Sequence, residues 1–527
     1  MKIFHDILVN DSKNKSVPEM HDLTVSKLLS GELGRDGEDF KKMFDRCSDI
    51  IYRDFKISGE HRAMLFFLDG FVDAEQINSD LLKPLLNCSI KDITNRKIAL
   101  MDINSIIKAV VSVANINKSR DFREIIENTF SGKTILLVDG INEALVINLI
   151  KTEKRAISES TIEPVIRGPR DGFTEDLQTN ITLVRKRIKT PKLKTEKLQV
   201  GKISKTNVIV SYIEGVADEA LINEIKSRIS LIEIDAVLES GYIEEMIEDN
   251  RLSVFPQLGY TERPDRLASS LLEGQVAIFV DNTPIVLIAP YTFIQALQSG
   301  DDYYERYIPA VMIRSVRYLF LMLALLLPSF YIAVLTFHQG MIPRSLLFTI
   351  WQSREGVPFP TFVETIIMEV FFEGLREAGI RLPGISGQTV SIVGALVIGE
   401  AAVRAGIVSS ATVIIVAITG IASFILPRYN IALSIRVLRF GMMILAGTLG
   451  LYGMFLGIFF ILIHMAKLQS FGVPYLSPVA PLNINSLKDV LIRAPRWAMT
   501  NRPGFISSKN RQRMKNPELH LNEEKNN

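Results

Sequence analysis

Hydrophobic residues follow two different patterns along this chain, and the change falls near residue 315. Residues 1–315 mix short apolar runs with many Lys, Glu, Asp and Arg residues, whereas residues 316–466 consist mainly of Leu, Ile, Val, Phe, Gly and Ala. A helix needs about 20 mostly apolar residues to cross a membrane, and only the second region supplies several such runs. The pattern therefore predicts an α/β cytoplasmic N-terminal region followed by an α-helical multi-pass transmembrane domain.

Short apolar runs in the first region are typical of buried strands. Ala63–Leu68 and Thr134–Val138 each end in an Asp-Gly pair, which favours a turn. Val208–Ile213 reads as a third strand and is followed by a helical pattern over Asp218–Ser227. These alternating elements indicate an α/β arrangement.

The apolar stretch Gln275–Leu297 has the length of a membrane span but is interrupted by Asp281-Asn282. It therefore predicts two strands joined by a turn. Helical periodicity covers Asp36–Ser58 and Val72–Asn87, and residues 233–248 suggest further βα alternation. We expect two α/β subdomains that divide between residues 160 and 205.

The resulting prediction has five parts with distinct composition. They are a polar N-terminal tail (1–40), α/β subdomain 1 (41–185), α/β subdomain 2 (186–300), a helical transmembrane domain (301–470) and a basic cytoplasmic C-terminal tail (471–527).

Three long apolar runs predict membrane helices, namely Val316–Phe337, Ile407–Leu426 and Gly441–Met465. Thr389–Val403 is a weaker fourth candidate, because it is short and carries Glu400 near its end. The alternative is a set of buried helices in a large soluble core. Four such runs between residues 316 and 466 argue against that alternative.

Basic residues flank the apolar region on both sides. Arg306, Arg314 and Arg317 precede the first run, and a basic tail follows the last one. The excess of Lys and Arg on cytoplasmic loops predicts that both ends are cytoplasmic, which requires an even number of crossings. In a four-span model, however, an outside loop would hold the basic residues Arg428, Arg436 and Arg439. The sequence does not resolve this conflict.

The segment Pro358–Ile380 lies between prolines and predicts a separate helix with an acidic stripe. Glu369, Glu373 and Glu377 recur every four residues, so they share one face, and Arg376 can pair with Glu373. Carboxylates at membrane depth usually face a bundle interior or a water-filled cavity, which favours an ion path or a gate. An amphipathic helix at the membrane surface with solvated acids fits the pattern equally well.

Composition excludes several functional classes. The formal net charge is +2, and no basic stripe interleaved with aromatic residues indicates nucleic-acid binding. Only Cys47 and Cys88 are present, and the six histidines are scattered, so we expect no disulfide framework and no metal site. No catalytic triad or cofactor-binding motif appears, and we therefore expect neither an enzyme nor a cofactor.

Four motifs resemble the A subunit of the GerA family of spore germinant receptors. They are Glu163–Glu175 (EPVIRGPRDGFTE), Leu252–Gln257 (LSVFPQ), Arg354–Pro360 (REGVPFP) and Glu377–Gly384 (EAGIRLPG). The resemblance implies a multi-pass protein of the inner membrane of the bacterial spore, in contact with membrane lipid. It also implies a transporter-like B subunit and a lipoprotein C subunit as partners, and a homo-oligomeric ring of A subunits.

The resemblance sharpens two hypotheses about sites. In a ring, Glu369, Glu373 and Glu377 would present circles of carboxylates, which favour cations. Glu400 joins the candidate ion path because it lies in the weaker span. For Arg167, Arg170 and Asp171, a subunit or domain contact competes with a turn held by local salt bridges around Gly-Pro and Asp-Gly pairs.

Three functions remain open at this point. The first is the A subunit of a nutrient-triggered receptor that forms an oligomeric cation channel. The second is an accessory channel paralogue that amplifies ion release. The third is a signalling scaffold that the membrane domain only anchors.

Overall fold

The computed structural model describes residues 27–57, 61–87, 116–149, 160, 163–381, 399–506 and 510–514. Cys88, most of the N-terminal tail and most of the weak span Thr389–Val403 lie outside these ranges. The chain forms two compact units. The first comprises Met1–Glu248, Leu258–Pro290 and Arg496–Asn527, and the second comprises Asp249–Gln257 and Tyr291–Pro495.

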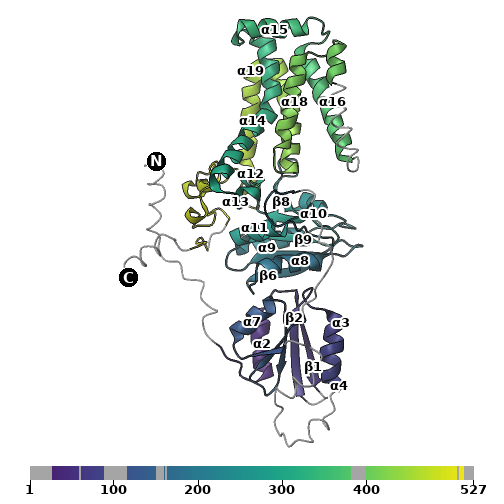
Figure 1. Ribbon diagram of the computed structural model, residues 1–527, viewed down its shortest axis with the longest axis vertical. Helices are drawn as coiled ribbons and strands as arrows, with labels where there is room; N and C mark the ends of the chain where they lie inside the picture. Colours follow the sequence, from purple (N-terminus) through teal and green to yellow (C-terminus); the bar gives the residue numbers. More distant parts are fainter. Residues whose placement is uncertain are drawn as a thin grey trace, which may run out of the picture. The chain divides into compact units, whose positions relative to one another are not determined.

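The first unit begins with a five-stranded antiparallel sheet in the order β1-β2-β4-β5-β3. Phe40 and Phe122 stack at 4.4 Å, and Phe40 also contacts Phe66 of the sheet, so α2 and α7 share one layer. Figure 1 shows α3 and α4 on the other side of the strands. The elements are α2 (Leu33–Met43), β1 (Ile50–Ile57), β2 (His61–Leu68), α3 (Ala74–Gln76), η1 (Ile77–Leu82), α4 (Lys83–Asn87), β3 (Ile116–Ser119), α7 (Phe122–Phe130), β4 (Thr134–Val138) and β5 (Ala144–Ile147).

A second five-stranded antiparallel sheet follows, in the order β6-β7-β9-β10-β8. Alternate residues of β7 point to opposite faces, and both sets are buried. Ile209 and Ile213 belong to the core formed with α8 and α11, whereas α9 and α10 pack on β6 and β10. The elements are α8 (Leu177–Arg187), β6 (Leu193–Val200), β7 (Thr206–Ile213), α9 (Glu219–Ser230), α10 (Ser240–Ile247), β8 (Gly259–Thr261), α11 (Pro264–Glu273), β9 (Val276–Val280) and β10 (Val286–Ala289).

Most predicted elements of this unit are confirmed, including the two strands within Gln275–Leu297. The helix predicted over Asp36–Ser58 is wrong beyond residue 43, because residues 50–57 form the edge strand β1. An edge strand exposes many polar residues. In β1 their spacing along the sequence resembles that of the polar face of an amphipathic helix. No strand forms over residues 233–239. The expected boundary at residue 185 falls inside α8, whose buried apolar residues belong to the second core.

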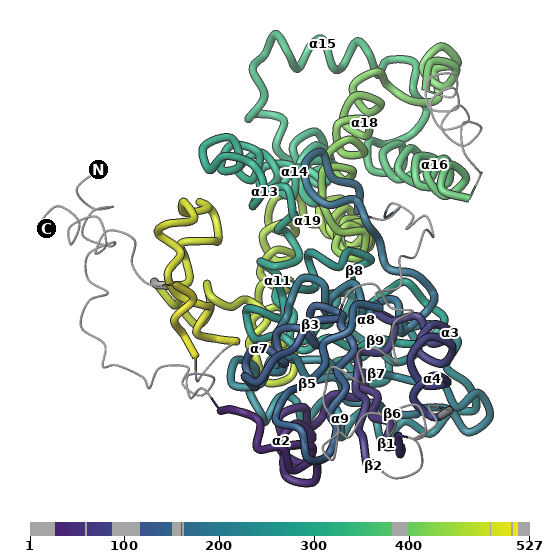
Figure 2. The backbone as a smooth tube through the Cα atoms, turned by 60° about the horizontal axis from the view of Figure 1, so that its bottom comes forward, coloured from purple at the N-terminus to yellow at the C-terminus, as the bar shows by residue number. Residues whose placement is uncertain are grey.

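The second unit is helical. The helices α14 and α19 are each long and apolar enough to span a membrane, and α18 is a shorter apolar helix. α16 packs beside α18, and α14 beside α19, as both views show (Figure 1 and Figure 2). The elements are α12 (Phe293–Ala296), α13 (Asp301–Tyr304), α14 (Tyr307–Phe337), η2 (Gln339–Met341), α15 (Arg344–Arg354), α16 (Thr361–Arg381), α18 (Ser410–Phe424), α19 (Tyr429–Lys467), β11 (Gln469–Ser470), β12 (Val473–Pro474) and η3 (Ile484–Asp489), while η4 (Arg496–Ala498) belongs to the first unit.

The long element α19 is a hairpin of two helical arms that meet at Gly450. Gly450 has φ 63° and ψ −143°, which is outside the helical region. Ser434 of the first arm binds the Val254 carbonyl, and His464 of the second arm lies 2.9 Å from Ser253 Oγ. A continuous helix would separate residues 434 and 464 by about 45 Å, since each residue adds 1.5 Å. The two arms therefore run antiparallel.

This hairpin corrects the prediction of one continuous span over Gly441–Met465, because the turn lies inside that run. It also moves Arg436 and Arg439 out of the expected loop and onto the first arm. At the turn, a Cβ on Gly450 would lie 3.0 Å from Phe337 Cβ at the end of α14. The hairpin turn and the end of α14 are thus at the same end of the bundle.

Candidate functional site

The acidic stripe of α16 runs from the bundle interior to its surface. Glu369 is completely buried, Glu373 is half-buried and Glu377 is exposed. Among the residues that the structure describes, Glu377 pairs with Arg381, one turn further along the same helix, at 2.7 Å. The equal spacing of these acids therefore does not give them equal environments.

Arginines of the first arm of α19 neutralise the two inner acids. Arg439 Nη2 lies 2.9 Å from Glu369 Oε2, and both side chains are fully buried. Arg436 donates a short hydrogen bond to Glu373, and Arg376 Nη1 is 3.5 Å from the same carboxylate. We call these five residues the bundle charge cluster. Three arginines and two glutamates give it a formal charge of +1.

Arg376 connects the bundle charge cluster to α18. Its Nη2 donates a 2.5 Å hydrogen bond to Ser423 Oγ. The guanidinium also lies over the rings of Phe424 and Phe372, at 4.6 and 5.0 Å from their centroids. These cation–π contacts provide compensation for a buried positive charge where carboxylates are fewer than arginines.

Sequence reasoning missed another buried acid, Glu364, one turn from the start of α16. Its carboxylate is fully buried and accepts a 2.5 Å hydrogen bond from the backbone N–H of Ser409. Arg354 lies 3.5 Å away. Ser409 is the N-cap of α18, so Glu364 fixes where that helix begins. Glu364 lies outside the four-residue repeat of the stripe, and only the motif that contains Arg354 pointed to this region.

Glu400 does not join the bundle charge cluster. Its side chain is 55% exposed and pairs with Arg404 at 2.5 Å, one helical turn away. The structure thus brings together Glu369, Glu373 and Arg376 and leaves Glu377 and Glu400 apart. Within the part of the chain that the structure describes, no three His, Cys, Asp or Glu side chains are arranged to hold a metal ion.

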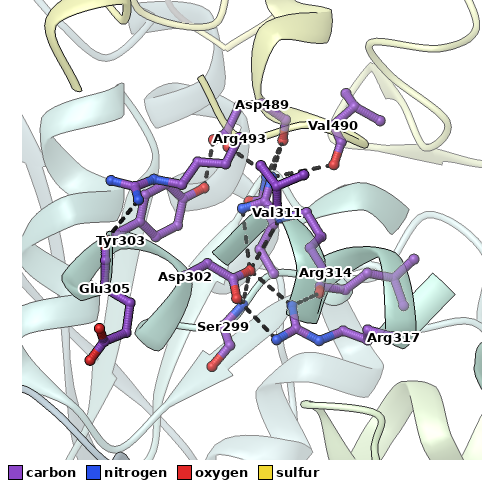
Figure 3. A network of polar contacts seen from close by, with 12 residues as sticks. Ser299, Asp302, Tyr303, Glu305, Val311, Arg314, Arg317, Asp489, Val490 and Arg493 are labelled. Carbon is purple, nitrogen blue, oxygen red and sulfur yellow. Dashed lines mark hydrogen bonds and ion pairs between the residues drawn. The ribbon is translucent and has the colours of Figure 1, made fainter. Parts of the chain in front are cut away.

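A second buried polar network ties the start of α14 to the C-terminal segment (Figure 3). Asp302 accepts from Arg317 Nη1 and Nη2, at 2.8 and 3.0 Å. Arg314 lies 3.2 Å from the same carboxylate and donates a 2.9 Å bond to Asp489 of η3. Arg493 Nη1 donates to the Glu305 carbonyl at 2.9 Å.

This network changes the interpretation of the flanking arginines. Arg314 and Arg317, expected as basic residues at the mouth of the first span, are buried in ion pairs. Burial, followed by the charge of Asp489, raises the pKa of Tyr303 well above its ordinary value, so Tyr303 stays protonated and donates a 2.5 Å bond to Asp489. The start of α14 is therefore fastened to the chain that follows α19.

The residues predicted as a subunit or domain contact lie on a loop before α8. Asp171 accepts two 2.7 Å bonds from Arg187 Nη2 of α8. Arg167 and Arg170 are exposed, and so is Ile166. Asp171 is therefore paired with a residue of α8, 16 positions further along the chain.

Comparison with known proteins places these features in a family. The family model described as Bacillus/Clostridium GerA spore germination protein matches residues 38–505. Spore germination protein KA of Bacillus subtilis is 43% identical over 92% of this chain and 89% of its own length. Spore germination protein GerLA of Bacillus cereus is 38% identical over 91% and 97%.

This chain is also similar to two further proteins, whose similarity gives less information about function. The uncharacterized membrane protein YfkQ of Bacillus subtilis is 45% identical over 95% of this chain and 96% of its own. The crystal structure of the N-terminal domain of the A subunit of the Bacillus megaterium spore germinant receptor GerK3 is 35% identical. It covers 51% of this chain and 99% of its own, with a TM-score of 0.41. Since the family model spans nearly all of the sequence, this chain belongs to the GerA family of spore germination proteins.

Proposed function

We propose that this chain is the A subunit of a nutrient-triggered germinant receptor in the inner membrane of the spore. It acts with a transporter-like B subunit and a lipoprotein C subunit. Copies of it assemble into a channel that releases cations from the spore core. The membership in a germination family and the names of its relatives support the receptor role.

The bundle charge cluster is the observation that supports a gated channel. Glu369 and Glu373 are held by arginines of α19 in the described conformation, so they offer no free carboxylates to a passing cation. Buried charges at membrane depth are costly and mark functional positions. Separation of α16 from α19 would release both acids, and in a ring of copies they would then form circles that attract cations.

The hairpin of α19 supports an even number of crossings. α14 runs toward the turn at Gly450, and the second arm of α19 runs back from it. Near the start of α14, Phe293 donates to the Tyr475 carbonyl at 2.9 Å, just after α19 ends. The N-terminal region and the C-terminal segment thus belong on one side of the membrane, which we assign to the spore core.

Two of the three arginines that conflicted with the positive-inside rule, Arg436 and Arg439, support this assignment, whereas Arg428 still lies between α18 and α19. Arg436 and Arg439 are paired with carboxylates inside a helix, so they are not free loop charges that set orientation.

Recording from the full-length protein in a planar lipid bilayer tests the channel. We expect currents with cations favoured over anions, and a shift of the reversal potential toward zero in Glu369→Gln/Glu373→Gln. Glu400→Gln, which changes an exposed acid, is the matched control and should leave selectivity unchanged. A protein that is folded, oligomeric and electrically silent would instead be a scaffold.

Spores that lack this chain test the receptor role separately. A receptor subunit predicts loss of the response to particular nutrients, with other responses intact. An accessory channel predicts slower ion release after every nutrient, and that result would contradict the assignment as a receptor subunit.

A further inference from the structure

The segment from Asp249 to Gln257, here the 249–257 loop, contains the motif Leu252–Gln257, to which the proposed function gives no role. The loop leaves the second sheet after α10 and returns to it at β8, yet it belongs to the helical unit. Gln257 closes it, because its side chain accepts a 2.9 Å bond from the Asn250 N–H and donates a 2.7 Å bond to the Asn250 carbonyl. The loop is therefore a preformed element that continues into the second sheet at both ends.

Phe255 anchors the 249–257 loop inside the helical unit. Its side chain is 2% exposed and belongs to the core that contains residues of α14 and of both arms of α19. The ring lies 6.0 Å from the ring of His464 and 6.1 Å from that of Tyr475. Withdrawal of a large ring from a close-packed core is costly, so the loop and the two arms move together.

Polar contacts fasten the 249–257 loop to each arm of α19 separately. The hydroxyl of Ser434, which is buried on the first arm, donates a short hydrogen bond to the Val254 carbonyl. On the second arm, His464 Nε2 lies 2.9 Å from Ser253 Oγ. Both contacts are about fifteen residues from Gly450 along the chain. The loop therefore bridges the two arms at the end of the hairpin opposite its turn.

The first arm of α19 connects the 249–257 loop with the bundle charge cluster. Ser434 comes two residues before Arg436, which corresponds to about 200° around a helix. The side of the arm that contacts the loop is therefore turned away from the side that pairs with Glu373. Arg439, three residues further on, holds Glu369. A shift or rotation of this arm relative to α16 would consequently change the loop contact and both ion pairs together.

We propose that the 249–257 loop controls the gate by holding the first arm of α19 where Arg436 and Arg439 neutralise the acids of α16. This inference rests on the proposed function and names the element that regulates the gate. A change in the second sheet reaches the loop through α10 and β8, and the loop passes it to the arm through Ser434. Once the loop shifts, the arm loses this support, and Glu369 and Glu373 are released.

Three serine-to-alanine variants of the full-length protein test this control in a planar lipid bilayer. Ser434→Ala and Ser253→Ala each remove a hydroxyl that joins the loop to an arm. Each should raise the open probability about fivefold, because the lost hydrogen bond stabilises the closed conformation. Cation selectivity should stay the same, because the acids are unaltered. Ser315→Ala is the matched control, since this hydroxyl bonds the Val311 carbonyl of its own helix, and it should open as the unmodified chain does.

The outcomes separate control by the 249–257 loop from the channel itself. If the unmodified chain conducts and either loop variant opens no more often, the loop does not control the gate, while the channel stands. A lower melting temperature in detergent without a change in opening would assign these hydroxyls to the fold alone and would also contradict the inference. An unmodified chain that is folded, oligomeric and electrically silent overturns the channel, and control of its gate with it.

Discussion

The second sheet domain and the helical unit place polar and apolar side chains in opposite ways. In the sheet domain, β9 and β10 are buried throughout and charged residues lie mainly outside. In the helical unit, Glu369 and Arg439 are fully buried, while Ile414, Ile418 and Ile421 of α18 are exposed. A surface of that kind is stable when lipid or another subunit covers it. The comparison shows that hydrophobic residues of the same types fill the interior of one unit and cover the outside of the other.

Buried ion pairs occur in both units, but their surroundings differ. In the first unit, Arg185 makes two bonds to Asp49, at 2.7 and 2.9 Å, and Thr195 donates a third bond to this carboxylate. In the helical unit, the pair of Glu369 and Arg439 is supported mainly by other charges of the bundle charge cluster. The first pair is satisfied locally, whereas the second depends on how three helices are placed.

The largest expected effect comes from breaking the pair in the helical unit. Glu369→Leu leaves Arg439 buried without its carboxylate and should destabilise the protein by about 3–5 kcal/mol. Glu369→Leu/Arg439→Leu removes both charges and should recover most of that loss. Thermal unfolding in detergent measures both. Equal stability of the single and the double variant would show that the pair is not coupled.

Removing one partner in the first unit should have a slightly smaller effect. Arg185→Met leaves Asp49 buried with the Thr195 hydroxyl as a remaining donor, so we expect a loss of about 2–4 kcal/mol. Denaturant unfolding followed by far-UV circular dichroism measures this loss in the free energy of unfolding. An unchanged midpoint would mean that Asp49 becomes hydrated or protonated at little cost.

The turn of the α19 hairpin is the next test. Gly450→Ala places a Cβ at a positive φ and 3.0 Å from Phe337 Cβ, which should cost about 1–3 kcal/mol. Gly441→Ala, in a helical position with open space, is the control and should be neutral or stabilising. A continuous helix through residue 450 would predict that both substitutions stabilise.

Glu244 gives a prediction about pH in the sheet domain. Its pKa of about 7 in the folded chain lies above the ordinary value of 4.5, so folding takes up a proton between these values. The neutral acid is tolerated below about pH 5, and stability falls as pH rises through 7. Glu244→Gln should therefore stabilise the protein by about 1–3 kcal/mol at pH 8 and much less at pH 5. A gain that is the same at both pH values would contradict the raised pKa.

The smallest effect is expected at an exposed pair on a helix. Glu400→Gln removes an i, i+4 partner of Arg404, and both side chains are more than half exposed. Such pairs contribute about 0.3–0.5 kcal/mol, so the melting temperature should hardly change. A large loss would indicate that Glu400 is buried against lipid or a neighbouring subunit in the assembled state.

Local pattern was enough to predict much of the fold. Thr134–Val138 and the two strands within Gln275–Leu297 follow from short apolar runs with turn residues between them. The separate helix α16 follows from its flanking prolines, and the start of α9 follows from the capping residue Asp218. The edge strand β1 was missed because its outer residues are polar, although its ladder partner β2 begins only a few residues later.

The bundle charge cluster could not be predicted from the local sequence pattern. The repeat of Glu369, Glu373 and Glu377 predicted a common face but no partners. Arg436 and Arg439 follow more than sixty residues later, and their role depends on the first arm of α19 running antiparallel to α16. Nothing in the spacing indicates that two of the acids are neutralised and the third is not.

The sequence by itself determined where this protein is soluble and where it is apolar, the type of most of its elements, and the family to which it belongs. Those properties depend on neighbours along the chain and on short motifs. Only the tertiary structure decided that α19 folds back at Gly450, that Arg314 and Arg317 are buried beside Asp302, and that the acids of α16 face arginines. The physical reason is that charge pairing and burial are set by distances in space between residues far apart in sequence.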